Sequence, residues 1–246
     1  VPGATGRSGL NKMLSAPADG YTISIMTGDT FGLLADPQPS WSLDALIPVA
    51  IMIRQPSAFL AAENGPIKTW ADVEREAKTR PLKVAVTGFG SPDDMTVNFF
   101  VRRGLKLVSV PFAKPGERYS AILGGHADLL YEQPGDVRNF IDSKQMRPVI
   151  IFGEKRHPAF AGVPVSKELG FDITMPQFRM VTVKAGTDPE KVKLLSDELA
   201  KVAKSADYAR YLEDQLADSD SYIPANEALA FLRGELEAMK KHASAR

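Results

Sequence analysis

The chain has 246 residues, of which 44% are hydrophobic and 24% are charged, as in ordinary globular proteins. Thirty basic residues balance thirty acidic ones, which argues against a nucleic-acid-binding protein, since such proteins normally carry a basic excess or stripe. The sequence contains no cysteine, so disulfides, zinc–thiolate sites and thiol catalysis are excluded. It also lacks an apolar run long enough to span a bilayer. The length allows one large domain or two small ones.

The first third of the chain alternates strands with short helices. Tyr21–Met26 is rich in β-branched and aromatic residues and predicts a strand, with Thr27–Thr30 following at its carboxyl end. Thr69–Asp72 resembles a capping box and predicts a helix start. The pattern predicts helices over 7–16 and 69–79, and further strands over 46–53 and 57–62.

The central stretch, residues 82–128, contains two strand–turn–helix units in tandem. Lys83–Val86 predicts a buried strand, Thr87–Gly90 a turn, and Ser91-Pro92 a helix start with Ser as N-cap. A Gly-rich turn that leads into a helix favours an anion, because the first amides are unpaired and the helix dipole is positive there. This turn matches neither a dinucleotide fingerprint nor a P-loop.

The second unit of the stretch follows the same logic. Residues 107–110 predict a strand, 111–116 a turn, 117–123 a helix, and 127–130 another strand. Both turns then lie at the carboxyl ends of parallel strands, the edge where open α/β sheets bind ligands. The loops expected at strand ends are 27–30, 87–91, 112–118 and 131–136.

The rest of the chain changes in texture after one more α/β segment. Residues 134–143 predict a helix, and 147–152 and 178–184 predict strands. Three helical stretches then follow, over 188–204, 206–217 and 224–242. Val192, Leu195, Leu199 and Val202 share one helical face, so we expect these helices to pack back onto the first part of the chain.

Residue patterns for catalysis or metal binding are missing from the sequence. The three histidines have no metal-ligand spacing, and no nucleophile elbow or related motif occurs. Asp93 and Asp94 could form an acid/base pair, but acids in a first helical turn also favour the dipole and are expected to point outward. We therefore expect a binding cleft with no catalytic residue, metal or cofactor.

The order of several short motifs resembles the substrate-binding proteins of tripartite tricarboxylate transporters, the periplasmic receptors often called Bug proteins. The resemblance runs from Val1 to about Leu216, with a weaker helical tail. Leu123–Asp128, which reads LGGHAD, is its most specific piece. The other matching pieces are Pro2–Gly6, Pro17–Thr22, Ile47–Ala50, Lys68–Asp72, Gly88–Ser91, Val110–Phe112 and Gly186–Pro189.

The resemblance implies an α/β fold with two lobes that close over a ligand, in the manner of type II periplasmic binding proteins, with two mixed sheets flanked by helices. Lobe one would comprise residues 1–56 and 182–246, with the C-terminal helices packed on it, and lobe two residues 57–181. Family members normally carry a further strand and helix before the Pro2–Gly6 loop, and these are expected to be absent here.

The resemblance also implies a set of ligand-binding residues at the strand ends. The expected set is Thr27, Gly28, Asp29, Thr30, Thr87, Gly88, Phe89, Gly90, Ser91, Lys114, Arg118, Gln133, Phe178 and Arg179. Several members depart from the family pattern: Asp94 stands for a His, Phe112–Lys114 for Tyr-Lys-Gly, Glu117-Arg118 for Pro-Ala, and Phe178 for a Trp. These departures are the positions expected to set ligand choice.

The expected function is a periplasmic receptor, probed here as a monomer, that hands a small organic acid to the membrane permease of such a transporter. Lys114, Arg118 or Arg179 could bind a second carboxylate, which favours a dicarboxylate, aliphatic or aromatic, over a monoacid. An amino acid would instead pair its ammonium with Asp94. An enzyme on a related two-lobe scaffold and an effector-sensing domain of a regulator remain alternative functions.

Overall fold

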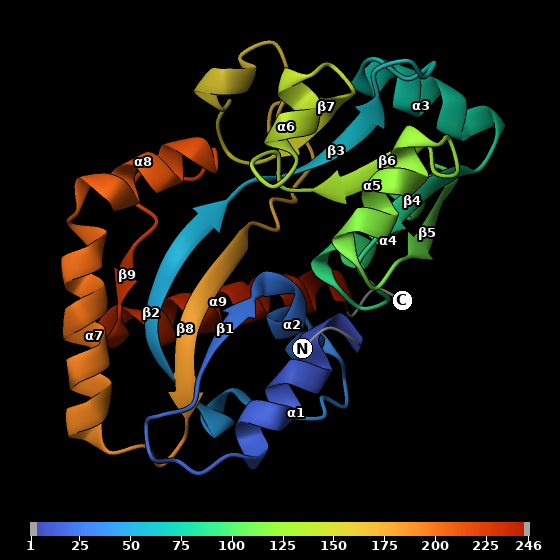
Figure 1. The fold of residues 1–246 in the computed structure, drawn as a ribbon. Helices are drawn as coiled ribbons and strands as arrows, with labels where there is room; N and C mark the ends of the chain where they lie inside the picture. The colour runs from blue at the N-terminus through green and yellow to red at the C-terminus, as the bar shows by residue number, and fades with distance from the viewer. Residues whose placement is uncertain (1–3, 244–246) are drawn as a thin grey trace. The chain divides into compact units, whose positions relative to one another are not determined.

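The structure is a computed structural model that describes residues 4–243. The chain divides into two compact units, each built on its own β-sheet (Figure 1). Unit 1 contains residues 4–55 and 177–243, and unit 2 contains residues 56–176. The second division falls at 176/177, whereas the sequence places it at 181/182, because β8 (Gln177–Lys184) pairs along its whole length with strands of unit 1.

The sheet of unit 1 has the strand order β1-β8-β2-β9, and its paired strands are antiparallel. The partners of β8 are β1 (Ile23–Thr27), β2 (Leu46–Gln55) and, through β2, β9 (Ile223–Pro224). Figure 1 shows β8 between β1 and β2. The helices of this unit are α1 (Arg7–Ser15), α2 (Gly28–Gly32), α7 (Pro189–Ala203), α8 (Ala206–Asp214) and α9 (Ala225–Ala243), with short 3₁₀ turns at Ala4–Gly6, Leu33–Ala35 and Leu43–Ala45.

The C-terminal helices pack back onto this sheet, which confirms the expectation from the sequence. Both α7 and α9 contact β2, and α7 runs beside β2 in Figure 1. The ring of Phe231 in α9 lies 5.4 Å from that of Phe178 in β8. Period-2 burial along β8 leaves Phe178 and Met180 fully covered, so one face of the sheet forms the core under α9.

The sheet of unit 2 is mixed, with the strand order β5-β4-β6-β3-β7. Here β4 (Leu82–Val86) is parallel to both β5 (Leu107–Pro111) and β6 (Leu129–Glu132). The remaining strands, β3 (Ser57–Ala62) and β7 (Met146–Phe152), pair antiparallel. The two strand–turn–helix units predicted from the sequence are therefore confirmed, and the turns after β4 and β5 lie at one edge of the sheet.

The helices of unit 2 begin where the capping residues predicted. The helices are α3 (Trp70–Thr79), α4 (Pro92–Val101), α5 (Pro115–Leu123) and α6 (Arg138–Asp142), with a 3₁₀ turn at Pro158–Phe160. The capping box before α3 is confirmed, since Thr69 and Asp72 each accept a hydrogen bond from the other's backbone amide. Aromatic rings fill the core: those of Phe59 and Phe152 lie 5.0 Å apart. This packing gives the strand-end turns a rigid base.

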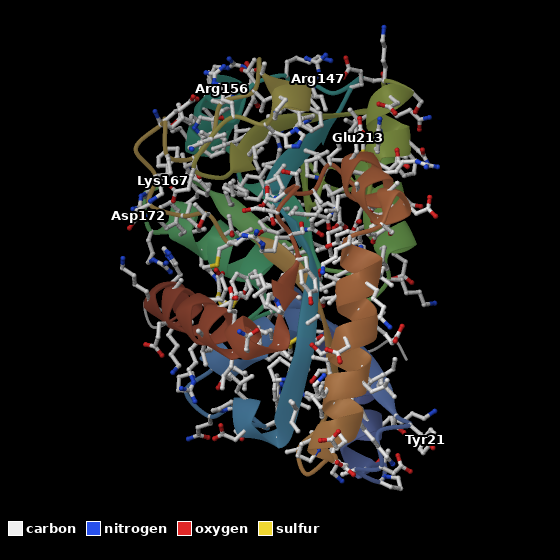
Figure 2. The ribbon with its side chains drawn as sticks, turned by 90° about the vertical axis from the view of Figure 1, so that its left-hand side faces the viewer. Tyr21, Arg147, Arg156, Lys167, Asp172 and Glu213 are labelled. Carbon is white, nitrogen blue, oxygen red and sulfur yellow. The ribbon has the colours of Figure 1, made fainter. Side chains whose placement is uncertain are left out.

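The surface of unit 2 carries exposed ion pairs. Lys167 and Asp172 pair at 2.7 Å on the outer surface, where Figure 2 labels both. Arg156 pairs with Glu168 at 2.8 Å in the same segment. Within residues 4–243, none of the helices is both long enough and apolar enough to cross a membrane.

Candidate functional site

The turn between β4 and α4 is held by its own hydrogen bonds. Ser91 is the N-cap of α4, as predicted, and its hydroxyl accepts from the Asp94 amide at 3.4 Å. The same hydroxyl donates to the Gly88 carbonyl at 2.6 Å, and the Ser91 side chain is fully buried. Because this donor is already used inside the turn, Ser91 supports the shape of the segment instead of presenting a hydroxyl to a ligand.

The acids of the first turn of α4 point inward, so the expectation that they lie outward is wrong. Asp93 and Asp94 are 2% and 5% exposed. Asp93 accepts from the Thr87 amide at 2.7 Å, and Asp94 accepts from the Gly90 amide at 2.9 Å. The unpaired amides of the turn and the positive end of the helix dipole attract these carboxylates. Two amides expected to bind a ligand carboxylate therefore already have carboxylate acceptors.

Asp94 is also bound from the neighbouring strand. Its second oxygen accepts from the Ser109 hydroxyl of β5 at 2.8 Å. Both of its oxygens thus have donors within unit 2, and the side chain is turned toward β5. This arrangement leaves Asp94 poorly placed to pair with the ammonium group of an amino acid.

Phe89 is the most exposed member of the turn. It is 66% exposed, while Gly88 before it is buried and Gly90 after it has φ +79°. That φ lies in the left-handed region, which favours glycine and lets the chain turn sharply behind the ring. The hydrogen-bonded turn therefore displays an apolar ring at the carboxyl end of β4.

Arg118 lies in the first turns of α5 and forms a buried ion pair with Glu132, the last residue of β6. Their side chains lie 2.7 Å apart, and each is 6% exposed. The Tyr119 hydroxyl donates to the same Glu132 oxygen at 3.2 Å, and Arg118 donates weakly to the Phe112 carbonyl at 3.5 Å. The positive charge predicted to reach a ligand is therefore balanced inside the protein.

Burial shifts the ionisation of this cluster. It raises the pKa of the Glu132 carboxyl above its ordinary value, while Arg118 beside it limits the rise. Burial and the neighbouring Glu132 carboxylate also raise the pKa of the Tyr119 phenol, so this hydroxyl stays a donor at neutral pH. The sequence analysis missed Glu132, although it lies in the predicted strand-end loop 131–136 and is the acid at the strand's end.

Gln133, the next residue, is directed toward the segments that connect the two units. Its side-chain amide donates to the Ser57 hydroxyl at 3.4 Å, and Ser57 donates to the Met175 carbonyl at 3.1 Å. The Tyr131 hydroxyl donates to the same carbonyl at 3.2 Å. Gln133 is 7% exposed, so its clearest role in unit 2 is to fix the chain near Ser57 and Met175.

Lys114 differs from Arg118 in its exposure. It is the N-cap residue of α5, and its side chain is 70% exposed. Its ammonium lies 3.8 Å from a Glu117 carboxylate oxygen, and Glu117 is 50% exposed. Exposed pairs of this kind contribute little, so the ammonium can exchange this partner for a ligand carboxylate.

The predicted residues of unit 1 gather at the end of β1. Thr27 lies directly opposite Arg179 of β8. Asp29 accepts from the side-chain amide of Gln177 at 2.6 Å. Gly28 is required beside this bond, because a Cβ there would lie 2.4 Å from the Gln177 carbonyl oxygen. The chain therefore packs tightly at the point where β1 leads into α2.

Two other predicted residues of unit 1 have structural partners. The Thr30 hydroxyl donates to the Thr5 carbonyl at 3.0 Å, and Thr30 is 7% exposed. Phe178 is 1% exposed, and its ring lies 5.4 Å from both Phe31 and Phe231. Phe178 thus belongs to the core of unit 1 in this structure, whereas the resemblance implies a ring that packs on the ligand.

The structure therefore groups the predicted residues into two sets, one in each unit. Thr87–Ser91, Lys114, Arg118 and Gln133 lie at the strand-end edge of unit 2. Thr27–Thr30 and Arg179 lie together in unit 1. Over residues 4–243, His, Asp and Glu side chains form no group of three or more that could hold a metal ion.

Comparison with known sequences identifies a family across nearly the whole chain. Residues 1–242 match the family described as tripartite tricarboxylate transporter family receptor, TctC. A UPF0065 protein of Cupriavidus necator is 28% identical over 86% of this chain and 65% of its own length. A second UPF0065 protein, from Bordetella bronchiseptica, is 26% identical over 82% of this chain and 61% of its own. The chain thus spans less than two thirds of these relatives.

Comparison with solved structures identifies the same fold. MatC from Rhodopseudomonas palustris, with bound malate, aligns with a TM-score of 0.87 and 20% identity over 98% of this chain and 85% of that one. A second R. palustris protein, with adipate, aligns with a TM-score of 0.89 and 21% identity over 98% of this chain and 83% of that one. The periplasmic binding protein BugD has a TM-score of 0.84 and 18% identity over 98% and 83%. The expected two-lobe α/β fold is confirmed.

Proposed function

We propose a function from one established fact, which is that the chain belongs to the tripartite tricarboxylate transporter receptor family, matched over residues 1–242. The protein binds a small organic acid through a carboxylate and delivers it to the membrane permease of such a transporter. The family match is the observation that carries this proposal, since the family consists of receptors and not of enzymes.

The strand-end edge of unit 2 supports a binding role. It brings a rigid turn, an exposed aromatic ring and an exposed ammonium group to the carboxyl ends of parallel strands, where α/β sheets commonly bind small molecules. It offers no activated nucleophile and no base held against one. Two proteins of the same fold hold malate and adipate, and both ligands are dicarboxylates. These ligands support an organic acid as the class of ligand, with a dicarboxylate as one form of it.

The location and partners belong to the same proposal. A receptor of this family works in the periplasm as a single chain that meets its permease after it has bound its ligand. Closure of two lobes over the ligand would shift an open–closed equilibrium and contribute to affinity. Neither a cofactor nor nucleic acid is needed for this role.

Titration calorimetry with malate and adipate tests the proposal, together with native mass spectrometry of the freshly purified protein. We expect at least one organic acid to bind reversibly and unchanged, and a mass increase that matches a small acid. Glucose serves as the uncharged control and should give no binding heat. Chemical conversion of a bound acid would favour an enzyme, and binding restricted to uncharged solutes would contradict the proposal.

A further inference from the structure

Unit 2 fills the anion-binding groups of its strand-end edge with its own carboxylates. Backbone amides at a helix start and a guanidinium group are the donors that a ligand's carboxylate would otherwise meet there. Each of the three internal carboxylates is at most 5% exposed. The three pairs are Asp93 with the Thr87 amide, Asp94 with the Gly90 amide, and Glu132 with the Arg118 guanidinium.

Resting on the proposed function, we propose that Glu132 takes the place of a ligand's second carboxylate at Arg118, and that the receptor therefore selects a monocarboxylate with an apolar body. The 2.7 Å pair is buried on both sides and receives a further hydrogen bond from Tyr119. A second ligand carboxylate could reach Arg118 only by displacing Glu132, which would leave an uncompensated buried charge. Removal of one partner from such a pair is strongly unfavourable.

The groups that stay accessible at this edge fit a single carboxylate. The Lys114 side chain is 70% exposed and only loosely paired with Glu117, so it can meet one carboxylate. Phe89 is 66% exposed on the rigid turn after β4 and offers an apolar face. One accessible cation and one accessible ring together suit a monoacid whose carbon chain or aromatic ring packs on Phe89.

Matched acids test this selection directly. Hexanoate and adipate differ only in the second carboxylate, and so do benzoate and terephthalate. Calorimetry should show that the wild-type protein binds the monoacid of a pair at least as tightly as the diacid. The Glu132→Gln variant keeps the size and a hydrogen-bonding oxygen but frees the Arg118 charge. It should raise the diacid-to-monoacid affinity ratio roughly tenfold, the effect of one hydrogen bond to a charged group.

Glu117→Gln is the matched control, because it makes the same chemical change on the same edge. It removes the loose partner of Lys114 and should strengthen both acids equally, so the affinity ratio should stay within about twofold of the wild-type value. A ratio that rises as much in Glu117→Gln as in Glu132→Gln would mean that net charge alone sets the preference, which would overturn the role of Glu132.

A double variant guards against misfolding of the single one. Arg118→Gln with Glu132→Gln removes both charges together, keeps side chains of similar volume and avoids an uncompensated buried charge. Its affinity ratio should remain that of the wild type. Loss of diacid binding in this variant would show that Arg118 binds the ligand and would overturn the proposal. A wild-type preference for the diacid that Arg179→Gln removes would also overturn it, by placing the second carboxylate on unit 1.

The outcomes separate this inference from the proposed function. If malate or adipate binds more tightly than every monoacid and Glu132→Gln leaves the ratio unchanged, the protein is still an organic-acid receptor and the inference is wrong. If none of these organic acids binds, both proposals fail. Binding of hexanoate or benzoate with a ratio that responds to Glu132 supports both.

Discussion

Each unit has a strand that ends in the dipeptide Thr-Gly, and the two segments that follow are built differently. In unit 2, Thr87-Gly88 leads into a turn whose amides are held by carboxylates from α4. In unit 1, Thr27-Gly28 leads directly into the five-residue helix α2, and the side chain of Asp29 is held by the neutral amide of Gln177. The same dipeptide therefore precedes an internally charged turn in one unit and a tightly packed helix start in the other.

The aromatic residues of the two regions differ in the same way. Phe89 lies 66% exposed on the turn of unit 2, whereas Phe178 lies 1% exposed at the start of β8 in unit 1. Both were expected to contact a ligand. The comparison shows that unit 2 displays its ring and buries its charges, while unit 1 buries its ring between two helices. Unit 2 is thus the better source of apolar contact with a ligand.

The largest expected effect comes from the two rings. Phe178→Ala should lower the free energy of unfolding by about 3–5 kcal/mol, because it removes a ring packed between Phe31 and Phe231 and leaves a cavity. Phe89→Ala should change it by less than about 0.5 kcal/mol, as is usual for an exposed site. Urea unfolding followed by circular dichroism measures both. Equal stability losses would contradict the contrast between the two regions.

The parts that the sequence predicted and the parts that it did not differ in range. Strands 82–86 and 107–111, the Ser91 cap and the Thr69–Asp72 capping box depend on residues within a few positions of one another, so their patterns are visible in the chain. The Arg118–Glu132 pair joins residues from different elements, and only the parallel alignment of β4, β5 and β6 brings them to one edge.

Burial of Phe178 and of the first-turn acids also depends on tertiary contacts. The sequence identifies β8 as a strand but does not say which of its faces α9 will cover, and that choice puts Phe178 beside Phe231. The position rule for first-turn acids describes exposed helices. It fails for Asp94 because Ser109 of the neighbouring strand supplies a second donor that rewards burial.

An intermediate effect should separate the acids of the two regions. Asp94→Asn should lower the free energy of unfolding by about 1.5–3 kcal/mol, because a buried carboxylate loses charged hydrogen bonds to the Gly90 amide and the Ser109 hydroxyl. Asp29→Asn makes the same change in unit 1 beside Gln177, where the side chain is half-buried, and should cost less than about 1 kcal/mol. Urea unfolding of the two variants measures the difference, and a larger loss for Asp29→Asn would reverse the comparison.

The smallest expected effect is the pH dependence that buried charge gives to unit 2. Burial raises the pKa of Glu132 above the ordinary 4.5, while Arg118 limits the rise and the carboxylates of Asp93 and Asp136 add to it. A folded-state pKa above the unfolded value stabilises the fold at pH values below 4.5. This contribution is lost as the pH rises through the folded-state pKa. Tyr119 faces the same group but remains protonated throughout this range.

The measurement is the difference in unfolding free energy between the wild type and Glu132→Gln from pH 4 to pH 8. This difference should fall as the pH rises and then become constant. Glu63 provides the control of opposite sign, since its hydrogen bond with Arg147, on the outer surface in Figure 2, lowers its pKa. The stability that Glu63 contributes is present above pH 4.5 and is lost as the pH falls, so the difference for Glu63→Gln should rise with pH. Two curves of the same sign would show that Glu132 is not ionised against the cost of burial, and the charge balance assigned to Arg118 would then be wrong.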